Sequence, residues 1–321
     1  MHNTSLKVTD FEPELGSFLA DVLRGLSKPH KSLPTQYLYD ERGSQLFDQI
    51  CETPEYYPTR TELGIMRSHS DALAAAVGAN ALLIEYGSGS SIKTRLLLDA
   101  LVDPAGYVPV DISREHLMNS AKALAERFDG LEVLPVCADF TVPFDVPKSA
   151  KEPARRVVYF PGSTIGNFTP DGATDLLKTM ASEAGRGGGL LIGVDLRKDT
   201  AVLEAAYDDA AGVTAAFNLN LLTRANRELG ANFDVSKFSH SAPYDTEAGR
   251  IELSLVSDVD QLVTVNGRSF AFTAGEEIHT EYSHKYTLAG FEALAAKAGL
   301  VRRNVWTDER DYFSVQYFEV Q

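Results

Sequence analysis

The sequence predicts an α/β fold in which a doubly wound, mostly parallel sheet is joined to a second, α+β domain. Between residues 71 and 196, five strand-like segments alternate with helix-like segments, the order that builds parallel βαβ units. The first strand ends in a glycine-rich turn, and the chain finishes with a helix and two strand-like segments. We therefore expect residues 61–198 and 287–321 to form the sheet domain, and residues 8–60 and 199–286 the second domain.

Each element follows from hydrophobic patterning and from its flanking residues. The strands of the parallel sheet are expected at residues 81–85, 106–110, 131–137, 156–160 and 189–194. The helices between them are expected at 92–101, 114–128 and 171–183, the last with its N-cap near Asp171. A helix at 289–298 and strands at 301–307 and 312–320 should return to this sheet, with an antiparallel last strand. The second domain should contain helices at 11–26, 201–211 and 214–228 and strands at 250–257 and 269–272.

Composition narrows the class of protein. The 321 residues are 44% apolar, yet no apolar run approaches the ~20 residues of a membrane span, and the N-terminus lacks the pattern of a signal peptide. The two cysteines, Cys51 and Cys137, suit a reducing cytoplasm. A net charge of −15 disfavours nucleic acid as a substrate. We expect a cytoplasmic protein without nucleic-acid or membrane partners.

The turn after the first strand, Glu85-Tyr-Gly-Ser-Gly89, contains two glycines that let the backbone approach a ligand closely. It is not the dinucleotide-binding pattern, which would require a third glycine at Ile92. An acidic residue followed by G-x-G is similar to the first motif of class I S-adenosylmethionine (SAM) methyltransferases. A turn that only packs a helix on a strand remains the alternative.

Polar residues follow the other strands, where open α/β sheets bind ligands. Asp111 lies 24 positions after Gly87, near the spacing at which a carboxylate meets ribose hydroxyls, although a helix N-cap would use the same residue type. Asp139 could accept a hydrogen bond from an adenine amino group, and Phe140 could form an apolar wall of the same site. Alternatively, Asp139 is an ordinary loop residue and Phe140 an ordinary core residue. Lys93 could bind the methionyl carboxylate of SAM, or be a surface lysine.

The loop after the fourth strand, Phe160-Pro-Gly-Ser-Thr-Ile-Gly-Asn-Phe-Thr-Pro170, is too rich in glycine, proline and small polar residues to be core. Amine methyltransferases place a polar group against the substrate nitrogen at this position. Thr164 and Asn167 are the candidates, and a structural turn closed by Asn and Ser side chains is the alternative.

Several motifs together resemble the L-histidine Nα-methyltransferase family of ergothioneine biosynthesis. They are Pro54-Glu-Tyr-Tyr-Pro-Thr-Arg60, Glu85-Tyr-Gly-Ser-Gly89, Gly162-Ser-Thr-Ile-Gly-Asn167, the segment Ala206–Asn218 and Thr280-Glu-Tyr-Ser-His-Lys285. The resemblance runs from about Ser32 to the C-terminus. It implies a SAM-dependent enzyme that methylates the α-amine of L-histidine three times to give hercynine, with S-adenosyl-L-homocysteine as the second product.

The resemblance also implies roles for individual residues. The cofactor would be bound by Gly87, Lys93, Asp111, Asp139 and Phe140. The substrate would be bound by Tyr56, Asn167, Tyr207, Glu281 and Ser283, with Phe47, Thr164 and Thr214 nearby. Catalytic roles would fall to Tyr39, Tyr56 and Asn167. Two departures, Leu253 in place of methionine and the flanks Tyr282 and His284, leave the preferred amino acid open, although neither removes a polar group that would bind an imidazole.

These residue types suit the chemistry. In a strand, Glu281 and Ser283 would share one face and could satisfy both imidazole nitrogens, since one is a carboxylate and the other a hydroxyl. Exposed polar residues on a surface strand are the alternative. Asn167 and Tyr207 could bind a carboxylate, and aromatic rings could stabilise a trimethylammonium product. Tyr39 and bulk water are both possible proton acceptors.

The sequence contains no set of metal ligands at the usual spacing, because His279 and His284 lack Cys or carboxylate partners, so we expect no metal site. Two other functions stay open. One is methylation of another amino acid or small amine, and the other is SAM binding without catalysis. We expect a monomer.

Overall fold

The computed structural model describes residues 8–11, 15–89, 92–142 and 144–321. It divides into two compact units. The first contains residues 1–13, 58–197 and 285–321, and the second contains residues 14–57 and 198–284. The sequence placed these boundaries one to three residues later, at 60, 198 and 286, and assigned residues 8–11 to the second domain.

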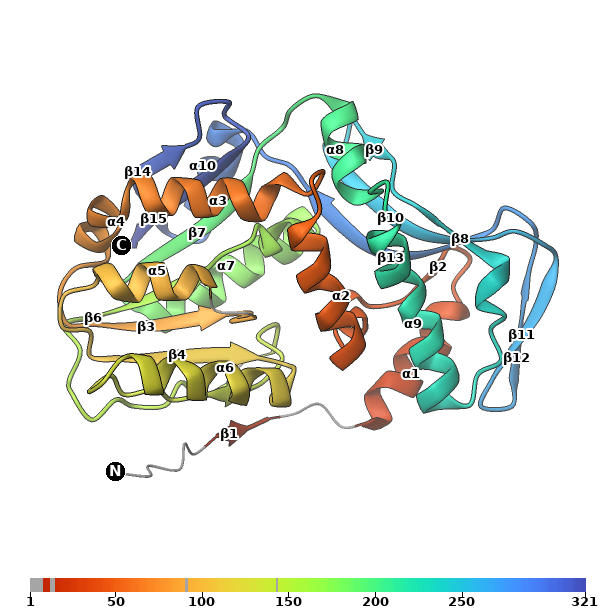
Figure 1. Cartoon of the computed structure of the whole chain (residues 1–321), viewed down its shortest axis with the longest axis horizontal. Helices are drawn as coiled ribbons and strands as arrows, with labels where there is room; N and C mark the ends of the chain where they lie inside the picture. The colour runs from red at the N-terminus through yellow and green to blue at the C-terminus, as the bar shows by residue number, and fades with distance from the viewer. Residues whose placement is uncertain (1–7, 12–14, 90–91, 143) are drawn as a thin grey trace. The chain divides into compact units, whose positions relative to one another are not determined.

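The first unit is built on an eight-stranded sheet (Figure 1). Its strands are β1 (Thr9–Asp10), β3 (Ala81–Tyr86), β4 (Gly106–Asp111), β5 (Val136–Cys137), β6 (Arg155–Phe160), β7 (Gly189–Asp195), β14 (Leu300–Thr307) and β15 (Phe313–Val320). Their order is β1-β5-β4-β3-β6-β7-β15-β14; β15 is antiparallel to both β7 and β14, and the other described pairs are parallel. This confirms the predicted doubly wound sheet with an antiparallel last strand. The order reverses at β3, the switch point at which such sheets bind ligands.

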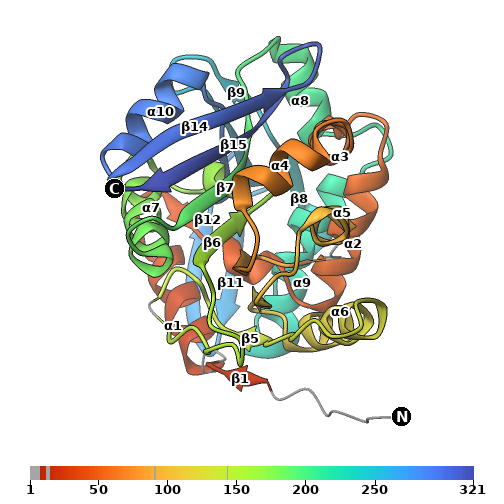
Figure 2. The same cartoon turned by 90° about the vertical axis from the view of Figure 1, so that its left-hand side faces the viewer.

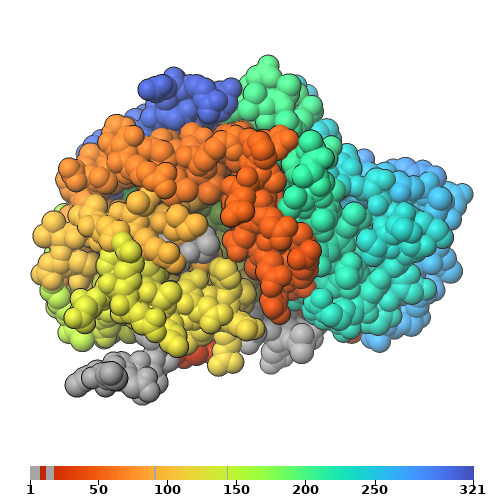
Figure 3. Space-filling view, viewed as in Figure 1, coloured from red at the N-terminus to blue at the C-terminus, as the bar shows by residue number. Residues whose placement is uncertain are grey.

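Helices cover both faces of this sheet. They are α3 (Tyr57–Ser68), α4 (Ser70–Val77), α5 (Ile92–Ala100), α6 (Arg114–Arg127), α7 (Pro170–Ala184) and α10 (Leu288–Ala296). Figure 2 shows α7 and α10 on one face and α4, α5 and α6 on the other. In Figure 3 the side chains of α3 to α6 close over the strands on the face turned to the viewer.

The alternation of side chains along β3 explains the two helix layers. Leu82 and Ile84 pack in a core with α7 and α10, whereas Ala81 and Leu83 pack in a second core with α3 to α6. Since successive side chains of a strand leave opposite faces, an uninterrupted apolar strand requires a cover on each side. All six residues of β3 are buried.

Three predicted elements change in detail, two in the first unit and one at the start of the second domain. The third strand is regular only at Val136–Cys137, because Pro135 has no N–H to donate to a ladder. The helix at 171–183 begins one residue earlier at Pro170 and is capped by Thr169, whose hydroxyl accepts from Gly172 N, so Asp171 is not the N-cap. The helix expected at 11–26 does not include Phe11, whose N–H donates to Cys137 O beside the sheet; residues 12–14 lie outside the described part, and α1 comprises Leu15–Leu26.

The second unit combines short strands with helices. Its strands are β2 (Lys31–Ser32), β8 (Phe238–Ser241), β9 (Tyr244–Asp245), β10 (Arg250–Ser257), β11 (Gln261–Val265), β12 (Arg268–Phe272) and β13 (Glu277–His284). Its helices are α1, α2 (Glu41–Glu52), α8 (Thr200–Tyr207), α9 (Val213–Leu229) and the 3-10 helices η1 (Thr35–Leu38) and η3 (Val235–Lys237). The antiparallel pair β10 and β13 forms the centre of the sheet, and α9 packs against α2, η1, β8 and β10.

The helix expected at 201–211 ends at Tyr207. The following Asp209 turns its carboxylate toward the next helix and accepts from Val213 N at 2.9 Å and from Thr214 N at 2.7 Å. A side chain that stabilises the start of α9 in this way favours a break between the two helices.

Candidate active site

The glycine-rich turn follows β3 at the switch point of the first unit. Gly87 and Gly89 have φ angles of +69° and +43°, which residues other than glycine rarely adopt. Gly87 N donates to Val110 O at 2.8 Å, and Gly89 N lies 3.3 Å from Asp111 Oδ2. The turn and the end of β4 therefore form one structure. The adjoining residues 90 and 91 lie outside the described part.

Asp111 is a carboxylate at the end of β4 and not the N-cap of the next helix, because Ser113 occupies that position. Asp111 Oδ1 accepts from Ser113 N at 2.8 Å. Burial raises the pKa of Asp111, and the N–H groups of Ser113 and Gly89 partly oppose this effect. A carboxylate so placed at the glycine turn fits the hydroxyl pair of a ribose.

Phe140 lies beside the same turn. A Cβ atom added to Gly87 would stand 3.9 Å from the Phe140 ring, and that ring stacks on Tyr86 with 5.2 Å between centroids. Asp139 Oδ1 accepts from Thr141 N at 2.9 Å and from Thr141 Oγ1 at 2.6 Å, which closes a local turn. Phe140 is thus brought to the glycine turn, whereas the described contacts of the Asp139 carboxylate are within its own loop.

Lys93 is not a solvated surface lysine. Its Nζ lies 2.5 Å from Oε2 of Glu62 on α3, a carboxylate that is fully buried. Glu62 also accepts from Gly162 N, at 2.9 Å for Oε2 and 3.2 Å for Oε1. One buried carboxylate therefore joins the lysine proposed for the cofactor to the start of the loop proposed for the substrate.

The loop after β6 has a strained backbone. Gly162 has a φ of +80°, and the next residue, Ser163, has a φ of +58° without being glycine. Ser163 Oγ accepts from Asp195 N at 2.9 Å, so the strained residue is held by its own side chain, and the preceding Gly162 is held by Glu62. Such strain persists only where surrounding contacts fix it, and it concentrates at functional sites. The following 3-10 helix η2 (Thr164–Asn167) carries the two predicted polar residues.

Glu85 does not turn toward the glycine loop. Its buried carboxylate accepts from Thr94 Oγ1 at 2.7 and 2.9 Å and from Tyr107 Oη at 2.5 Å. Burial raises the pKa of Glu85 to about 8, although Tyr107, Thr94 and Lys93 favour the charged form. The acidic residue of the motif thus ties α5 and β4 to β3 through its side chain.

In the second unit, five aromatic rings form a continuous cluster. Tyr39 lies 5.7 Å from Phe47 and 5.4 Å from Phe217, Phe47 lies 6.3 Å from Tyr56, and Tyr56 lies 5.9 Å from Tyr207, measured between ring centroids. Edge-to-face geometry at these distances stabilises aromatic pairs. The sequence had not singled out Phe217, and its 3.6-residue periodicity on α9 predicts only a core residue.

The polar end of this cluster lies on β13. Tyr207 Oη and Ser283 Oγ are 2.8 Å apart, and both residues are buried. Glu281 is only 7% exposed and pairs with Leu253 across the ladder, while Ser283 pairs with Ile251. The register shift falls beyond this stretch, between Leu253 and Ser254, so Glu281 and Ser283 share one face, as predicted for a strand.

The backbone of Tyr207 is held by His240. His240 Nε2 lies 2.8 Å from Tyr207 O and can only donate to it, so Nδ1 accepts from Asn218 Nδ2 at 3.0 Å. Asn218 is fully buried and also donates to Ser254 O. Thr214, one turn earlier on α9, donates its N–H to Asp209 and has no described contact with the other candidates. Asn218 is the last residue of the Ala206–Asn218 segment that resembles the family, whereas His240 is not recognisable from a local motif.

Within the described residues, no group of three or more His, Cys, Asp or Glu side chains is close enough to bind a metal ion. Nor does any described helix have the length and apolar character needed to cross a bilayer.

Comparison with known proteins identifies the family. Residues 18–320 match the model of the family described as "Histidine-specific methyltransferase, SAM-dependent". The chain is 44% identical over 300 residues to the histidine N-alpha-methyltransferase of Mycolicibacterium smegmatis, with 92% of each chain covered. It is 32% identical over 293 residues to ergothioneine biosynthesis protein 1 of Neurospora crassa, covering 88% of this chain and 32% of that protein. Among solved structures, the CcbJ methyltransferase from Streptomyces caelestis matches with a TM-score of 0.48 and 15% identity, covering 80% of this chain and 96% of that chain. The chain therefore belongs to the histidine-specific, SAM-dependent methyltransferase family.

Proposed function

We propose that this methyltransferase transfers three methyl groups from SAM to the α-amino nitrogen of L-histidine and so produces hercynine for ergothioneine biosynthesis. The observation that carries the proposal is the buried pair of hydroxyls of Tyr207 and Ser283 beside Glu281 at the end of an aromatic cluster. Buried polar groups that share one strand face suit an imidazole. The 44% identity to a histidine N-alpha-methyltransferase supports the same substrate.

The first unit would bind the cofactor. The donor set fits the chemistry of SAM, because Asp111 offers a carboxylate to a ribose, Lys93 a cation to a carboxylate, and Phe140 a ring wall beside the Gly87 turn. Asp139 would accept from the adenine amino group. Bound there, SAM supplies a methyl group on a sulfonium, and methyl transfer needs no metal.

The second unit would bind the amino acid. Glu281 and Ser283 would hold the two imidazole nitrogens, and Asn167 and Tyr207 would bind the α-carboxylate. A pocket built to hydrogen-bond a substrate rejects an apolar analogue strongly, because the buried Glu281 would lose its partner. Thr164 and Thr214 would support these contacts. The aromatic rings of Tyr39, Phe47 and Tyr56 would face the amine as it becomes a fixed cation, each contributing about 1 kcal/mol.

Methyl transfer requires a neutral amine aligned with the sulfonium, so the residues of the chain act mainly by orientation. Tyr39, as its phenolate, would accept the amine proton in each round and release it to water before the next, and Asn167 and Tyr56 would hold the nitrogen in line. We further propose that the enzyme works in the cytoplasm as a monomer on free histidine, without nucleic-acid or membrane partners, in keeping with its net charge of −15.

Mass analysis of the purified protein incubated with SAM and each amino acid separately tests the proposal. We expect product only with histidine, and none when SAM is left out. Methylation of a different amino acid or small amine in preference to histidine would overturn the substrate assignment and leave the enzyme class intact. SAM binding without any methylated product would favour the non-catalytic alternative.

A further inference from the structure

Tyr39 occupies a joint between two helices. It is the single residue between η1, which ends at Leu38, and Asp40, the N-cap of α2. The N–H of Tyr39 lies 3.4 Å from Gln36 O, a long and weak hydrogen bond. Because this bond is weak, the contacts of the residues on either side contribute to the position of Tyr39.

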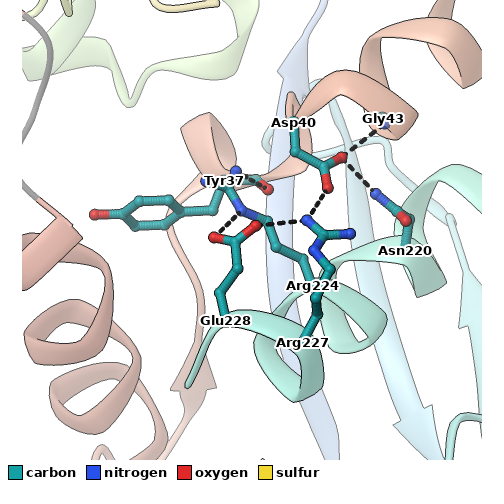
Figure 4. A network of polar contacts seen from close by, with 7 residues as sticks. All are labelled: Tyr37, Asp40, Gly43, Asn220, Arg224, Arg227 and Glu228. Atoms are coloured by element: carbon teal, nitrogen blue, oxygen red, sulfur yellow. Dashed lines mark hydrogen bonds and ion pairs between the residues drawn. The ribbon is translucent and has the colours of Figure 1, made fainter. Parts of the chain in front are cut away.

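Helix α9 contacts Tyr37 and Asp40 (Figure 4), and these two residues precede and follow Tyr39 in the sequence. On one side, Asp40 Oδ1 accepts from Asn220 Nδ2 at 2.8 Å and Oδ2 accepts from Arg227 Nη2 at 2.6 Å. On the other side, Arg224 Nη1 donates to the carbonyl oxygen of Tyr37 at 3.0 Å. Three side chains of one helix therefore bracket a single residue of the aromatic cluster.

We call the contacts of Asn220, Arg224 and Arg227 with Asp40 and the Tyr37 carbonyl the bracket. Its central groups, Asp40 and Asn220, are largely shielded from water. The side chain of Asp40 is only 8% exposed, and Asn220 is buried. Burial by itself would raise the pKa of Asp40, but Arg227, Gly43 N and Asn220 together hold it below its usual value, so the group stays charged. Gly43 also has no room for a side chain, because a Cβ atom would stand 1.8 Å from Leu38 O. The turn around Tyr39 is consequently tight.

The ring of Tyr39 also contacts α9. Phe217, with its centroid 5.4 Å away, precedes Asn220 by three residues on α9, so the two side chains lie on one face. Phe217 thus contacts the ring while Asn220, Arg224 and Arg227 fix the backbone around it. Displacement of Tyr39 relative to Phe47 and Phe217 would require these contacts to break.

We propose that Asn220, Arg224 and Arg227 are positioning residues that act on the reaction through Asp40, the Tyr37 carbonyl and finally the Tyr39 ring. The inference rests on the proposed function, in which Tyr39 faces the substrate amine. It assigns to α9 the task of setting the distance between that ring and the nitrogen to be methylated. A misplacement of about 1 Å can cost ~10²-fold in rate, so a loosened bracket should lower kcat.

Two variants separate this role from helix capping. Asn220→Leu removes the contact from α9 and leaves the Gly43 N bond of Asp40 in place. Asp40→Ser keeps an N-cap hydroxyl that is too short to reach α9. We expect each to lower kcat for histidine about 10- to 100-fold, with SAM affinity and thermal unfolding close to those of the unaltered protein. Thr223→Ala is the control on the same helix, since Thr223 is exposed and has no described contact with residues 37–40, and it should leave kcat unchanged.

A double-mutant cycle with Tyr39→Ala shows whether the effect passes through Tyr39. Product formation, followed by mass, should be no lower in Asn220→Leu/Tyr39→Ala than in Tyr39→Ala alone. An equal loss in both backgrounds would overturn the proposal, as would full activity of both bracket variants or the unfolding of both. Failure of the unaltered protein to methylate histidine would instead refute the proposed function, so the two failures are distinct.

Discussion

The carboxylate of Glu62 occupies the space that a side chain on Gly193 would need. A Cβ atom added to Gly193 of β7 would stand 2.1 Å from Glu62 Oε1 and 3.1 Å from Gly162 N. The absence of a side chain on β7 therefore allows an acidic residue of α3 to reach both Lys93 and the loop after β6.

Gly193→Ala should displace Glu62 and so break its contacts with Lys93 and with the loop after β6. Overpacking of a buried site costs about 1–3 kcal/mol of stability, and loss of the loop position should lower kcat/KM for histidine by at least ~10-fold. Gly64→Ala is the control, because nothing lies within 4 Å of the added Cβ on the same helix as Glu62. It should stabilise the protein by about 0.5–1 kcal/mol in thermal unfolding. Full activity of Gly193→Ala would contradict the role given to Glu62.

Asp111→Ala should weaken SAM binding by about 1.5–3 kcal/mol, the range for a hydrogen bond to a charged group. Isothermal titration calorimetry measures this directly. Asp99→Ala is a suitable control, since Asp99 forms an exposed ion pair with Arg127 between neighbouring helices. Unchanged affinity in Asp111→Ala would remove the ribose role and the ligand site at the end of β4.

Glu281→Ala should abolish most activity on histidine while SAM affinity stays near normal, because the buried carboxylate is proposed to bind the imidazole. The measurement is the ratio of kcat/KM for histidine to that for phenylalanine. Glu277→Ala, an exposed carboxylate on the same strand, should leave the ratio unaltered. A Glu281→Ala enzyme that still prefers histidine would show that the imidazole is recognised elsewhere.

The α-carboxylate should be required for the chemical step. Histamine keeps the imidazole but lacks the carboxylate proposed to meet Asn167 and Tyr207, so it should be a very poor substrate. Nα-methyl and Nα,Nα-dimethyl histidine should both be accepted, and the end point with histidine should be a mass gain of about 42 Da, from three added CH₂ units, without ring methylation. Turnover of histamine at the rate of histidine, or a reaction that stops after one methyl group, would refute this pocket.

Glu85 should make stability depend on pH. The pKa of Glu85 is about 8 in the folded protein, against the ordinary value of 4.5 that applies in the unfolded chain. Between these two pH values the folded protein therefore holds one more proton than the unfolded chain. The stability that Glu85 contributes is therefore present below about pH 4.5 and is lost as the pH rises through 8. Denaturant unfolding should show a fall of up to ~1.4 kcal/mol per pH unit from this group, a slope that Glu85→Gln removes and the exposed Glu126→Gln retains. Identical slopes for Glu85→Gln and the unaltered protein would exclude this effect.

The sheet and its strand-end residues could be predicted because they depend on local patterns. Apolar runs predicted four of the five core strands to within one residue at each end, whereas the third was expected at 131–137 and is regular only at Val136–Cys137. Asp111 followed from its place after one of these strands. Of the β11–β12 hairpin, only the second strand was predicted. The first could have been inferred from Asn266-Gly267, a dipeptide typical of hairpin turns, whose φ angles are +46° and +79°.

Other features depend on partners distant in the sequence. Glu62 meets Gly162 across 100 residues, and Asn220 meets Asp40 across 180, so no local pattern indicates either contact. The resemblance to the family suggested Tyr39, Tyr56 and Tyr207, but it could not show that Phe217 completes their cluster. The residue roles themselves stay predictions that the experiments above address.

The position of β15 has a consequence for biosynthesis. This strand, near the C-terminus, lies inside the sheet between β7 and β14, and residues 198–284 of the second unit are translated before it. The ribosome therefore releases the sequence of the second unit while the sheet of the first still lacks two strands and exposes the edge of β7. Since unpaired edges favour aggregation, nascent chains should need protection until residue 320 has emerged from the exit tunnel.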